Sequence, residues 1–223
     1  MRNTSRGLLA VFGAVLLGSQ VASAANIVLN PGFELDDASS GPVTTVTDWT
    51  ISAVSGIEDV GVESGFSDSG QNAAYIGYGT LSQSLITTIG TTYAVSFFVG
   101  IDDANTLTDP NASFDAVIGG QDLFGGVALT PGPPTPGTFL QCPNPTAPCS
   151  VEITDTFTAT STSTLLSFTG LTSLSGNVPT GVWYLDDVSV TAPTVVVSAP
   201  EPSGAALLLL AVPVIALVRR SPV

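Results

Sequence analysis

The chain has 223 residues, and its 18 acidic and 4 basic residues give a formal net charge of −14 with no histidine. Every Lys or Arg lies at one of the two ends, and Glu201 is the one acid outside residues 25–199, so this stretch has 17 acidic side chains and no cationic one. Such a body excludes nucleic-acid binding, which depends on Lys and Arg, and disfavours anionic lipid surfaces. Within this stretch the carboxylates can be stabilised by solvent, hydrogen-bond donors, protonation or bound cations, but not by salt bridges.

Residues 1–24 have the pattern of a cleaved secretory signal. Two arginines precede an apolar run from Gly7 to Gly18, and the small residues Ala22-Ser23-Ala24 follow it. The run is shorter than the ~20 residues that a bilayer-spanning helix needs, which disfavours a first transmembrane helix. Its removal leaves a body, residues 25–193, of the size of one domain with a sizeable core.

The body alternates apolar and polar residues with the period of a strand. In the segment 150–159, "SVEITDTFTA", Val151, Ile153 and Phe157 share one side and Glu152 and Thr154 lie on the other. Strands are predicted at residues 26–29, 48–52, 73–78, 81–87, 92–100, 113–119, 126–129, 150–159, 164–170 and 181–191. The predicted fold class is all-β, an antiparallel β-sandwich or jelly roll, flanked by an N-terminal signal helix and a C-terminal transmembrane helix.

One segment, residues 131–149, interrupts this rhythm with seven prolines. Proline cannot donate a hydrogen bond to a sheet, so the segment is predicted to be a surface loop. Export of the chain favours a disulfide between Cys142 and Cys149. A disulfide that closes so short a ring adds roughly 2.5 kcal/mol to the stability, so it would stiffen the loop more than it would stabilise the whole fold. A metal-binding cysteine pair is the alternative.

After a linker, residues 194–203, the chain ends on an apolar span. The 15 residues from Gly204 to Val218 are uncharged, and as a helix they extend about 22 Å. This is short of a ~30 Å hydrocarbon core, but flanking residues extend it. Arg219 and Arg220 at its end favour a cytoplasmic C-terminus, with the domain outside the inner membrane.

The motif Pro200-Glu201-Pro202, the apolar span 204–220 and its two terminal arginines together resemble the PEP-CTERM sorting signal of Gram-negative bacteria. The resemblance implies recognition and processing by an exosortase in the inner membrane, after passage through the export machinery. It further implies delivery to the cell surface or to an extracellular exopolysaccharide matrix. Pro213 departs from an unbroken span, and an ordinary C-terminal anchor is the alternative reading.

The body is similar to galactose-binding-like jelly rolls, a group that includes many carbohydrate-binding modules. The similar segments are "NIVLNPGFE" at 26–34, "LSQSL" at 81–85 and "WYLDDVSV" at 183–190. The resemblance implies a structural calcium ion shared by Glu34 and Asp186. The period of the last strand puts Asp186 on the face of Val188 and Val190, and a buried carboxylate without a cation needs a metal, N–H donors or a proton. Hydrogen-bonded carboxylates at a strand end are therefore the alternative.

No catalytic arrangement stands out, and the chain is predicted not to be an enzyme. Ser, Cys and Thr nucleophiles usually rely on a His or Lys base, and the body has neither. Asp68-Ser69-Gly70 is typical of a turn, although it resembles the triplet of aspartic proteases. The acidic pairs 36–37, 58–59 and 102–103 are predicted to be solvated turn residues. Asp155 shares the apolar parity of its strand, which is typical of an edge residue or a bulge, and no function is assigned to it.

The sequence thus predicts an exported surface or exopolysaccharide-matrix protein that binds polysaccharide and carries structural calcium. A structural matrix or adhesion protein without a defined ligand is one alternative, and a glycoside hydrolase that works with two carboxylates is another. Five aromatic residues are either core residues or sugar-stacking platforms, with the core as the default: Trp49, Tyr75, Tyr78, Trp183 and Tyr184.

Overall fold

The computed structural model describes residues 24–101, 109–125, 130–131, 139–140 and 149–193. The part described contains strands and no helix, and residues 24–193 form one compact unit. Its strands are β1 (Thr50–Ser52), β2 (Asp59–Ser64), β3 (Asn72–Ile86), β4 (Thr92–Ile101), β5 (Ser113–Ile118), β6 (Gln121–Asp122), β7 (Thr130–Pro131), β8 (Phe139–Leu140), β9 (Cys149–Thr158), β10 (Ser163–Leu171), β11 (Leu174–Ser175), β12 (Val178–Pro179) and β13 (Trp183–Thr191).

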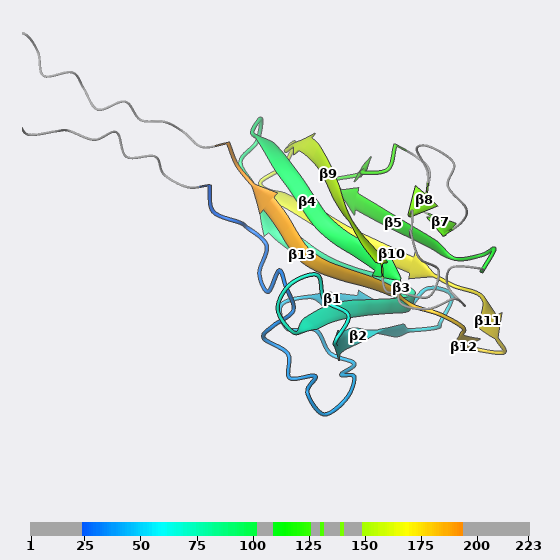
Figure 1. The fold of residues 1–223 in the computed structure, drawn as a ribbon. Helices are drawn as coiled ribbons and strands as arrows, with labels where there is room; N and C mark the ends of the chain where they lie inside the picture. Colours follow the sequence, from blue (N-terminus) through cyan, green and yellow to red (C-terminus); the bar gives the residue numbers. More distant parts are fainter. Residues whose placement is uncertain (1–23, 102–108, 126–129, 132–138, 141–148, 194–223) are drawn as a thin grey trace, which may run out of the picture. The chain divides into compact units, whose positions relative to one another are not determined.

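Two antiparallel sheets share one long strand, β3 (Figure 1). Residues 72–78 of β3 pair with β2, and 74–76 pair with β13, which makes the order β2-β3-β13-β4-β9; we call this sheet I. Residues 79–86 of β3 pair with β10, and 80–82 pair with β1, which makes the order β1-β3-β10-β5-β6; we call this sheet II. The antiparallel pairing within both sheets and the shared strand define a β-sandwich of the jelly-roll type, to which the short parallel pair β7 and β8 is added.

The change of sheet within β3 occurs at Gly79. This residue has φ +149°, and an added Cβ would lie 2.7 Å from Val60 Cγ2. Opposite it in β10 stands another glycine, Gly170, where an added Cβ would lie 2.6 Å from Ile76 Cγ2. Side chains at either position would force the two sheets apart, so the corner requires glycine.

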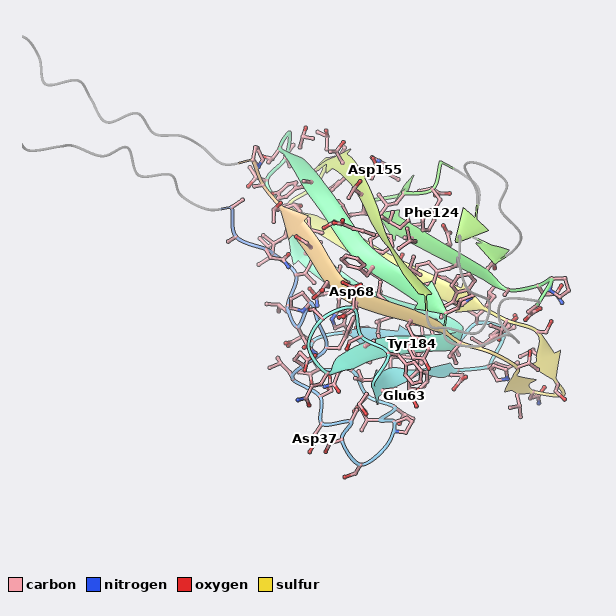
Figure 2. The ribbon with its side chains drawn as sticks, viewed as in Figure 1. Asp37, Glu63, Asp68, Phe124, Asp155 and Tyr184 are labelled. Atoms are coloured by element: carbon pink, nitrogen blue, oxygen red, sulfur yellow. The ribbon has the colours of Figure 1, made fainter. Side chains whose placement is uncertain are left out.

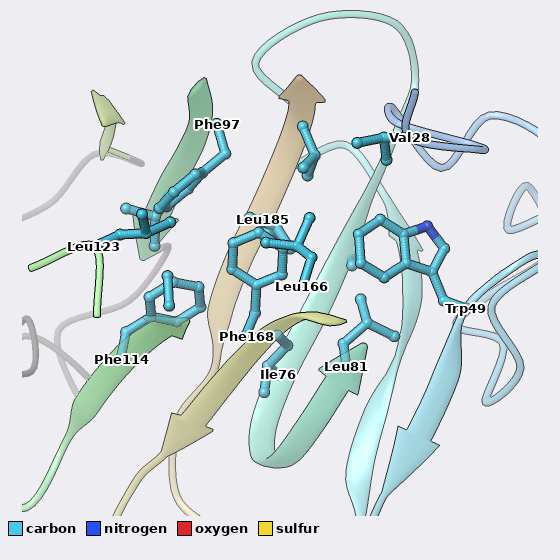
Figure 3. Packing of buried hydrophobic residues seen from close by; sticks show 14 of the residues in the cluster. Val28, Trp49, Ile76, Leu81, Phe97, Phe114, Leu123, Leu166, Phe168 and Leu185 are labelled. Carbon is cyan, nitrogen blue, oxygen red and sulfur yellow. The ribbon is translucent and has the colours of Figure 1, made fainter. Parts of the chain in front are cut away.

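The core between the sheets is rich in aromatic rings (Figure 3). Phe168 of β10 lies at its centre, with its ring centroid 5.0 Å from that of Phe97 in β4 and 6.1 Å from those of Phe114 in β5 and Trp49. These edge-to-face, stacked and tilted ring pairs add to the stabilisation that burial of the rings supplies. Trp183, which is fully buried, extends the cluster from sheet I.

The predicted fold class is confirmed in the described residues, but three strand predictions are wrong. Residues 72–86 form one strand rather than the two predicted at 73–78 and 81–87, because Gly79 between them marks a bend and not a turn. The strand β2 was not predicted, since Gly61 is typical of a turn, although Val60 and Val62 on either side of it keep the alternation of a strand. The segment 26–29 makes only an isolated bridge, between Asn26 and Thr191. Residues 126–129 lie outside the description.

Strand β9 lies at the edge of sheet I and pairs only with β4 among the described strands. The backbone of Thr156 is occupied on its outer side by two side chains: Gln121 Nε2 donates to its carbonyl oxygen at 2.9 Å, and its own N–H donates to Asp155 Oδ1 at 2.7 Å. Asp155 shares the inward parity of Ile153, as the sequence indicated. An inward charged residue on an edge strand blocks the addition of another strand, which gives Asp155 a structural role.

The outer face of sheet II carries hydroxyl groups that pair across strands. Thr80 Oγ1 lies 2.9 Å from Thr169 Oγ1, and Ser84 Oγ lies 2.9 Å from Ser163 Oγ. At the β5 end of this face, burial and the nearby Asp122 raise the pKa of Asp115, whose Oδ1 is buried without a hydrogen-bond partner among the described residues. Most hydroxyls of this face are thus satisfied within the protein.

Candidate functional site

Residues 68–72, which we call the amide loop, bind Asp186 through backbone N–H groups. Asp186 Oδ2 accepts from the N–H of Asp68 at 2.8 Å and from that of Ser69 at 3.1 Å. Asp186 Oδ1 accepts from the N–H of Asp187 at 2.8 Å. The side chain is 3% exposed, so three donors satisfy a carboxylate that water barely reaches.

The same loop binds Glu34 with its next two amides. Glu34 Oε1 accepts from the N–H of Gln71 at 2.6 Å and from that of Asn72 at 2.9 Å. Gly70, between the two pairs of donors, has φ +68°, and an added Cβ would overlap the Glu34 carboxylate. Successive N–H groups around a left-handed glycine form an anion-binding concavity, and here the anion is a side chain of the protein itself.

The amide loop therefore joins segments from the two ends of the domain. Glu34 follows the turn Asn30-Pro31-Gly32 near its start, and Asp186 belongs to its last strand. The two predicted ligands do converge: an added Cβ on Gly32 would lie 3.6 Å from Asp186 Oδ1 and 3.9 Å from Glu34 Cγ. The triplet Asp68-Ser69-Gly70 is a turn that presents backbone amides, as the sequence reading favoured.

The predicted reason for the burial of Asp186 is wrong, although the residue is buried. The pairing of β13 with β4 shifts register between Asp186 and Ser189, and Asp187 has φ +48°. This β-bulge reverses the alternation, so Leu185 and Val188 both pack in the core while Asp186 lies on the outer face of sheet I. The amide loop, and not the core, excludes water from its carboxylate.

Burial raises the pKa of Asp186 to about 6 from the ordinary 3.8, and the N–H groups of Ser69, Asp187 and Asp68 oppose the rise. The charge of Asp187 adds to the rise. Asp187 is itself held by Ser69, whose hydroxyl donates to its Oδ1 at 2.9 Å. Because residues 25–199 contain no cationic side chain, dipoles alone offset these charges within the body.

The fit of a calcium ion to this place is partial. Glu34 Oε2 accepts no hydrogen bond from the part of the chain described, and Asp186 Oδ1 has room for one more partner. Among the described residues, however, no three Asp, Glu, His or Cys side chains are placed to hold one metal ion. Calcium takes six to eight oxygen ligands, so backbone carbonyls and water would have to supply most of them.

Asp36 was predicted to be a solvated turn residue, and this is wrong. It is 8% exposed, and its Oδ1 accepts from the Thr47 N–H at 3.0 Å and from the Thr47 hydroxyl at 2.7 Å. Asn30 Nδ2 donates to Asp36 Oδ2 at 2.9 Å. The Asn-Pro-Gly turn is thus a buried polar network, and nothing in the sequence distinguishes Asp36 from the exposed Asp37 beside it.

A second apolar cluster lies on the outer face of sheet I, under the turn before the amide loop. The rings of Phe66 and Tyr184 stack with centroids 4.5 Å apart, and Tyr75 and Ala73 of β3 pack beside them. The Tyr184 hydroxyl donates to Glu63 Oε2 at 3.1 Å (Figure 2). Trp49, Trp183, Tyr75 and Tyr184 are all buried, which confirms packing as their default role, and Tyr78 is half-buried.

The rest of this face, over β13, β4 and β9, is hollowed into a trough of about 510 Å³. We call it the outer trough. Its central strand contributes the small residues Ala94 and Ser96, while hydroxyl residues and Glu152 stand on the flanking strands. Small side chains along the middle and larger ones on both sides produce the hollow. The lining residues are Ala94, Val95, Ser96, Glu152, Thr154, Asp155, Thr156, Ser189 and Thr191.

The hydroxyls of the outer trough differ from those of sheet II in being unpaired. The side chains of Ser96, Thr154, Thr156, Ser189 and Thr191 make no hydrogen bond with any described residue. In the register they form two rows across three strands, with Ser189 opposite Ser96 and Ser96 opposite Thr154. Each hydroxyl both donates and accepts, so the trough presents a ready set of partners for a polar ligand.

Glu152 and Asp155 do not form a pair of facing carboxylates in the trough. They have opposite parity on β9, and Asp155 Oδ1 accepts the N–H of its neighbour Thr156. The two-carboxylate geometry of a glycoside hydrolase therefore finds no support at this surface. Phe98, half-buried on the outer face, lies between Asp186 and Glu152 in the register and marks the acidic end of the trough.

Several predicted features lie outside the described residues. These are the signal segment, the partner cysteine Cys142, the motif Pro200-Glu201-Pro202 and the terminal Arg219-Arg220; of Cys149 only the backbone is described. In the part that is described, no helix is long and apolar enough to cross a membrane.

Comparison with known proteins gives no family assignment. No protein-family model matches the chain, and no curated protein matches it. Solved structures that resemble it include the Stig cyclase FisC from Fischerella sp. TAU, with a TM-score of 0.49 and 16% identity over 77% of this chain and 99% of that one. Others are the carbohydrate-binding modules TmCBM61, in complex with β-1,4-galactotriose, and the xylan-binding CBM22-1 of Paenibacillus barcinonensis Xyn10C.

TmCBM61 has a TM-score of 0.41 and 14% identity over 76% of this chain and 99% of the module. The CBM22-1 domain has a TM-score of 0.40 and 13% identity over 70% of this chain and 91% of the domain. At such similarity no residue role passes from one protein to another. The jelly-roll assignment made above rests on the sheet order and register of this chain.

We expect Asp186→Ala to lower the free energy of unfolding by about 2 kcal/mol, because it leaves the N–H groups of Asp68 and Ser69 without their acceptor. Glu34→Ala should cost less, about 1 kcal/mol, since water reaches its more exposed hydrogen bonds. Urea unfolding near neutral pH measures both. As a control, Asp37→Ala removes an exposed acid of the same segment. An Asp186 variant no less stable than this control would contradict the role of the amide loop.

Proposed function

We propose that this chain is an exported, non-catalytic protein that binds polysaccharide in the outer trough of sheet I. The observation that carries the proposal is the set of five unpaired hydroxyls on a hollowed sheet face. A sugar ring offers hydroxyls around its rim, and these pair with side chains that both donate and accept hydrogen bonds. Phe98 at one end of the trough supplies a half-buried ring against which a sugar face can stack.

The architecture supports a binding role for the trough more than a structural one. The hydroxyls on the outer face of sheet II are engaged with each other, whereas the five in the trough make no hydrogen bond with any described residue. Elsewhere on this face of sheet I, Thr92 Oγ1 and Thr158 Oγ1 pair at 2.9 Å. On the same face of sheet I, next to the trough, the amide loop and Phe66 cover the remaining part of the surface. Sheet I thus leaves one bounded hollow open and closes the surface next to it.

We expect Ser96→Phe to abolish polysaccharide binding, because the larger ring fills the middle of the trough from an outward-facing position. Affinity electrophoresis of the purified protein in gels containing xylan, galactan, mannan, β-glucan or chitosan measures binding. The wild type should be retarded by at least one of these, and the variant should lose affinity by at least about tenfold.

The matched control is Ser167→Phe, the same substitution at an outward-facing serine in the middle of sheet II. It should bind as the wild type does. Retardation of Ser96→Phe equal to that of the control, or no retardation of the wild type in any gel, would overturn the proposed function.

We also propose that a calcium ion binds beside Glu34 and Asp186, where it would relieve two converging carboxylates in a body without cations. A cation that binds the folded state alone raises stability, by about 2.7 kcal/mol at a hundredfold excess over Kd. The midpoint of thermal unfolding of the purified protein should therefore rise with calcium and fall with a chelator, and Glu34→Gln should remove the difference. Equal midpoints with calcium and with chelator would show that the amide loop alone holds the pair.

Finally, we propose that an exosortase processes the chain at its C-terminal end, with the domain then at the cell surface or in an exopolysaccharide matrix. Support comes from the sequence motif, the apolar span and Arg219-Arg220. In the native host, Glu201→Ala should keep an unprocessed chain in the inner-membrane fraction, while the wild type and Ser198→Ala reach the outside with a shortened C-terminus by mass spectrometry. Recovery of the wild-type chain from the cytosol with both ends intact would refute this.

A further inference from the structure

We propose that the polysaccharide bound in the outer trough carries free, protonated amino groups, and that the carboxylate of Glu152 recognises them. This inference rests on the proposed function, since it names the class of ligand for the same trough. It follows from the charge of the trough and of the surface around it, which is independent of the hydroxyl pattern.

Glu152 is the exposed acid among the residues that line the outer trough. It stands on the outer face of β9, opposite Phe98 of β4, and makes no hydrogen bond with any described residue. Its charge is not offset locally, because residues 25–199 contain no Lys, Arg or His. A ligand with a positive charge is therefore the natural partner for this carboxylate.

The surroundings of the trough reinforce this preference. Beyond Phe98 in the same register lie Asp186 and its neighbour Asp187, of which Asp187 is partly exposed. Acids near this end of the trough therefore stand on β9 and on β13, on either side of the central strand; Asp186 and Asp187 lie outside the lining and are held by residues 68 and 69. They belong to the 17 carboxylates of the body, which together create a negative potential over the hollow.

Three classes of polysaccharide respond differently to this potential. Chains with uronic acids, sulfate or phosphate are repelled, because no cationic side chain in the domain body can pair with them. Neutral chains meet only the hydroxyls. Chains with free amines use the same hydroxyls and in addition form a charge-assisted hydrogen bond from the ammonium group to Glu152, which strengthens binding and speeds the encounter.

A matched pair of ligands tests the inference directly. One is an oligosaccharide of β-1,4-linked glucosamine, and the other is its fully N-acetylated form of the same length, which differs in charge and not in backbone. Titration calorimetry of the purified protein, at a pH where the amines are protonated, should give an affinity about tenfold higher for the amine form at low salt. The difference should shrink at about 1 M salt, where the screening length falls to roughly 3 Å.

Glu152→Gln should weaken binding of the amine form about fivefold and leave the acetylated form unchanged, since it removes the charge and keeps the shape. The control is Glu58→Gln, the same substitution at an exposed acid next to β2, at the opposite edge of sheet I. It removes the same net charge and should change neither affinity.

The outcomes separate this inference from the proposed function. Equal affinities for the two oligosaccharides, or an unchanged amine affinity in Glu152→Gln, would overturn the inference. Binding of a neutral polysaccharide alone, with loss in Ser96→Phe, would overturn it while leaving the proposed function intact. If no glycan of any class binds, both fall together.

Discussion

Four backbone amides of residues 68–72 hold the carboxylates of Glu34 and Asp186, and the architecture of sheet I depends on this contact. The domain body has no cationic side chain, so an acid that folding places away from water must find N–H or O–H donors. The buried Asp36 and Asp109 obey the same rule, the first with Asn30 and Thr47 and the second with Ser173 and Asn111. Amide dipoles here take the place that ion pairs occupy in proteins of mixed charge.

This contact also divides the outer face of sheet I into two parts. Over β3 and the first half of β13, the covering turn brings Phe66 onto Tyr184 and closes the surface. Over β4, β9 and the second half of β13, nothing described covers the sheet, and small residues along β4 deepen it into the outer trough. The bulge at Asp187 lies at the boundary, because it allows the last strand to present Asp186 outward to the loop while Val188 returns to the core.

The fold class could be predicted from the sequence because alternation is a property of each strand by itself. The convergence of Glu34 and Asp186 came from a resemblance and not from periodicity, which gave the wrong face for Asp186 because a bulge leaves no mark in the composition. The joining of residues 72–86 into one strand depends on close packing at Gly79, and this is a tertiary property. The outer trough could not be predicted from the sequence, because its lining depends on the register among β4, β9 and β13. It also depends on small residues of β4 that form no recognisable motif in the sequence.

Strand β9, at the edge of sheet I, bears on whether copies of the protein aggregate. A long strand with vacant backbone groups is a template on which identical chains stack into fibres, and that tendency grows with crowding. In this chain Gln121 reaches across from β6 to the carbonyl of Thr156, and Asp155 occupies the adjoining N–H. A neighbour that tried to continue the sheet would have to displace both side chains and bury an unpaired charge. At Thr156 the edge of sheet I is thereby closed to the backbone of a neighbouring copy.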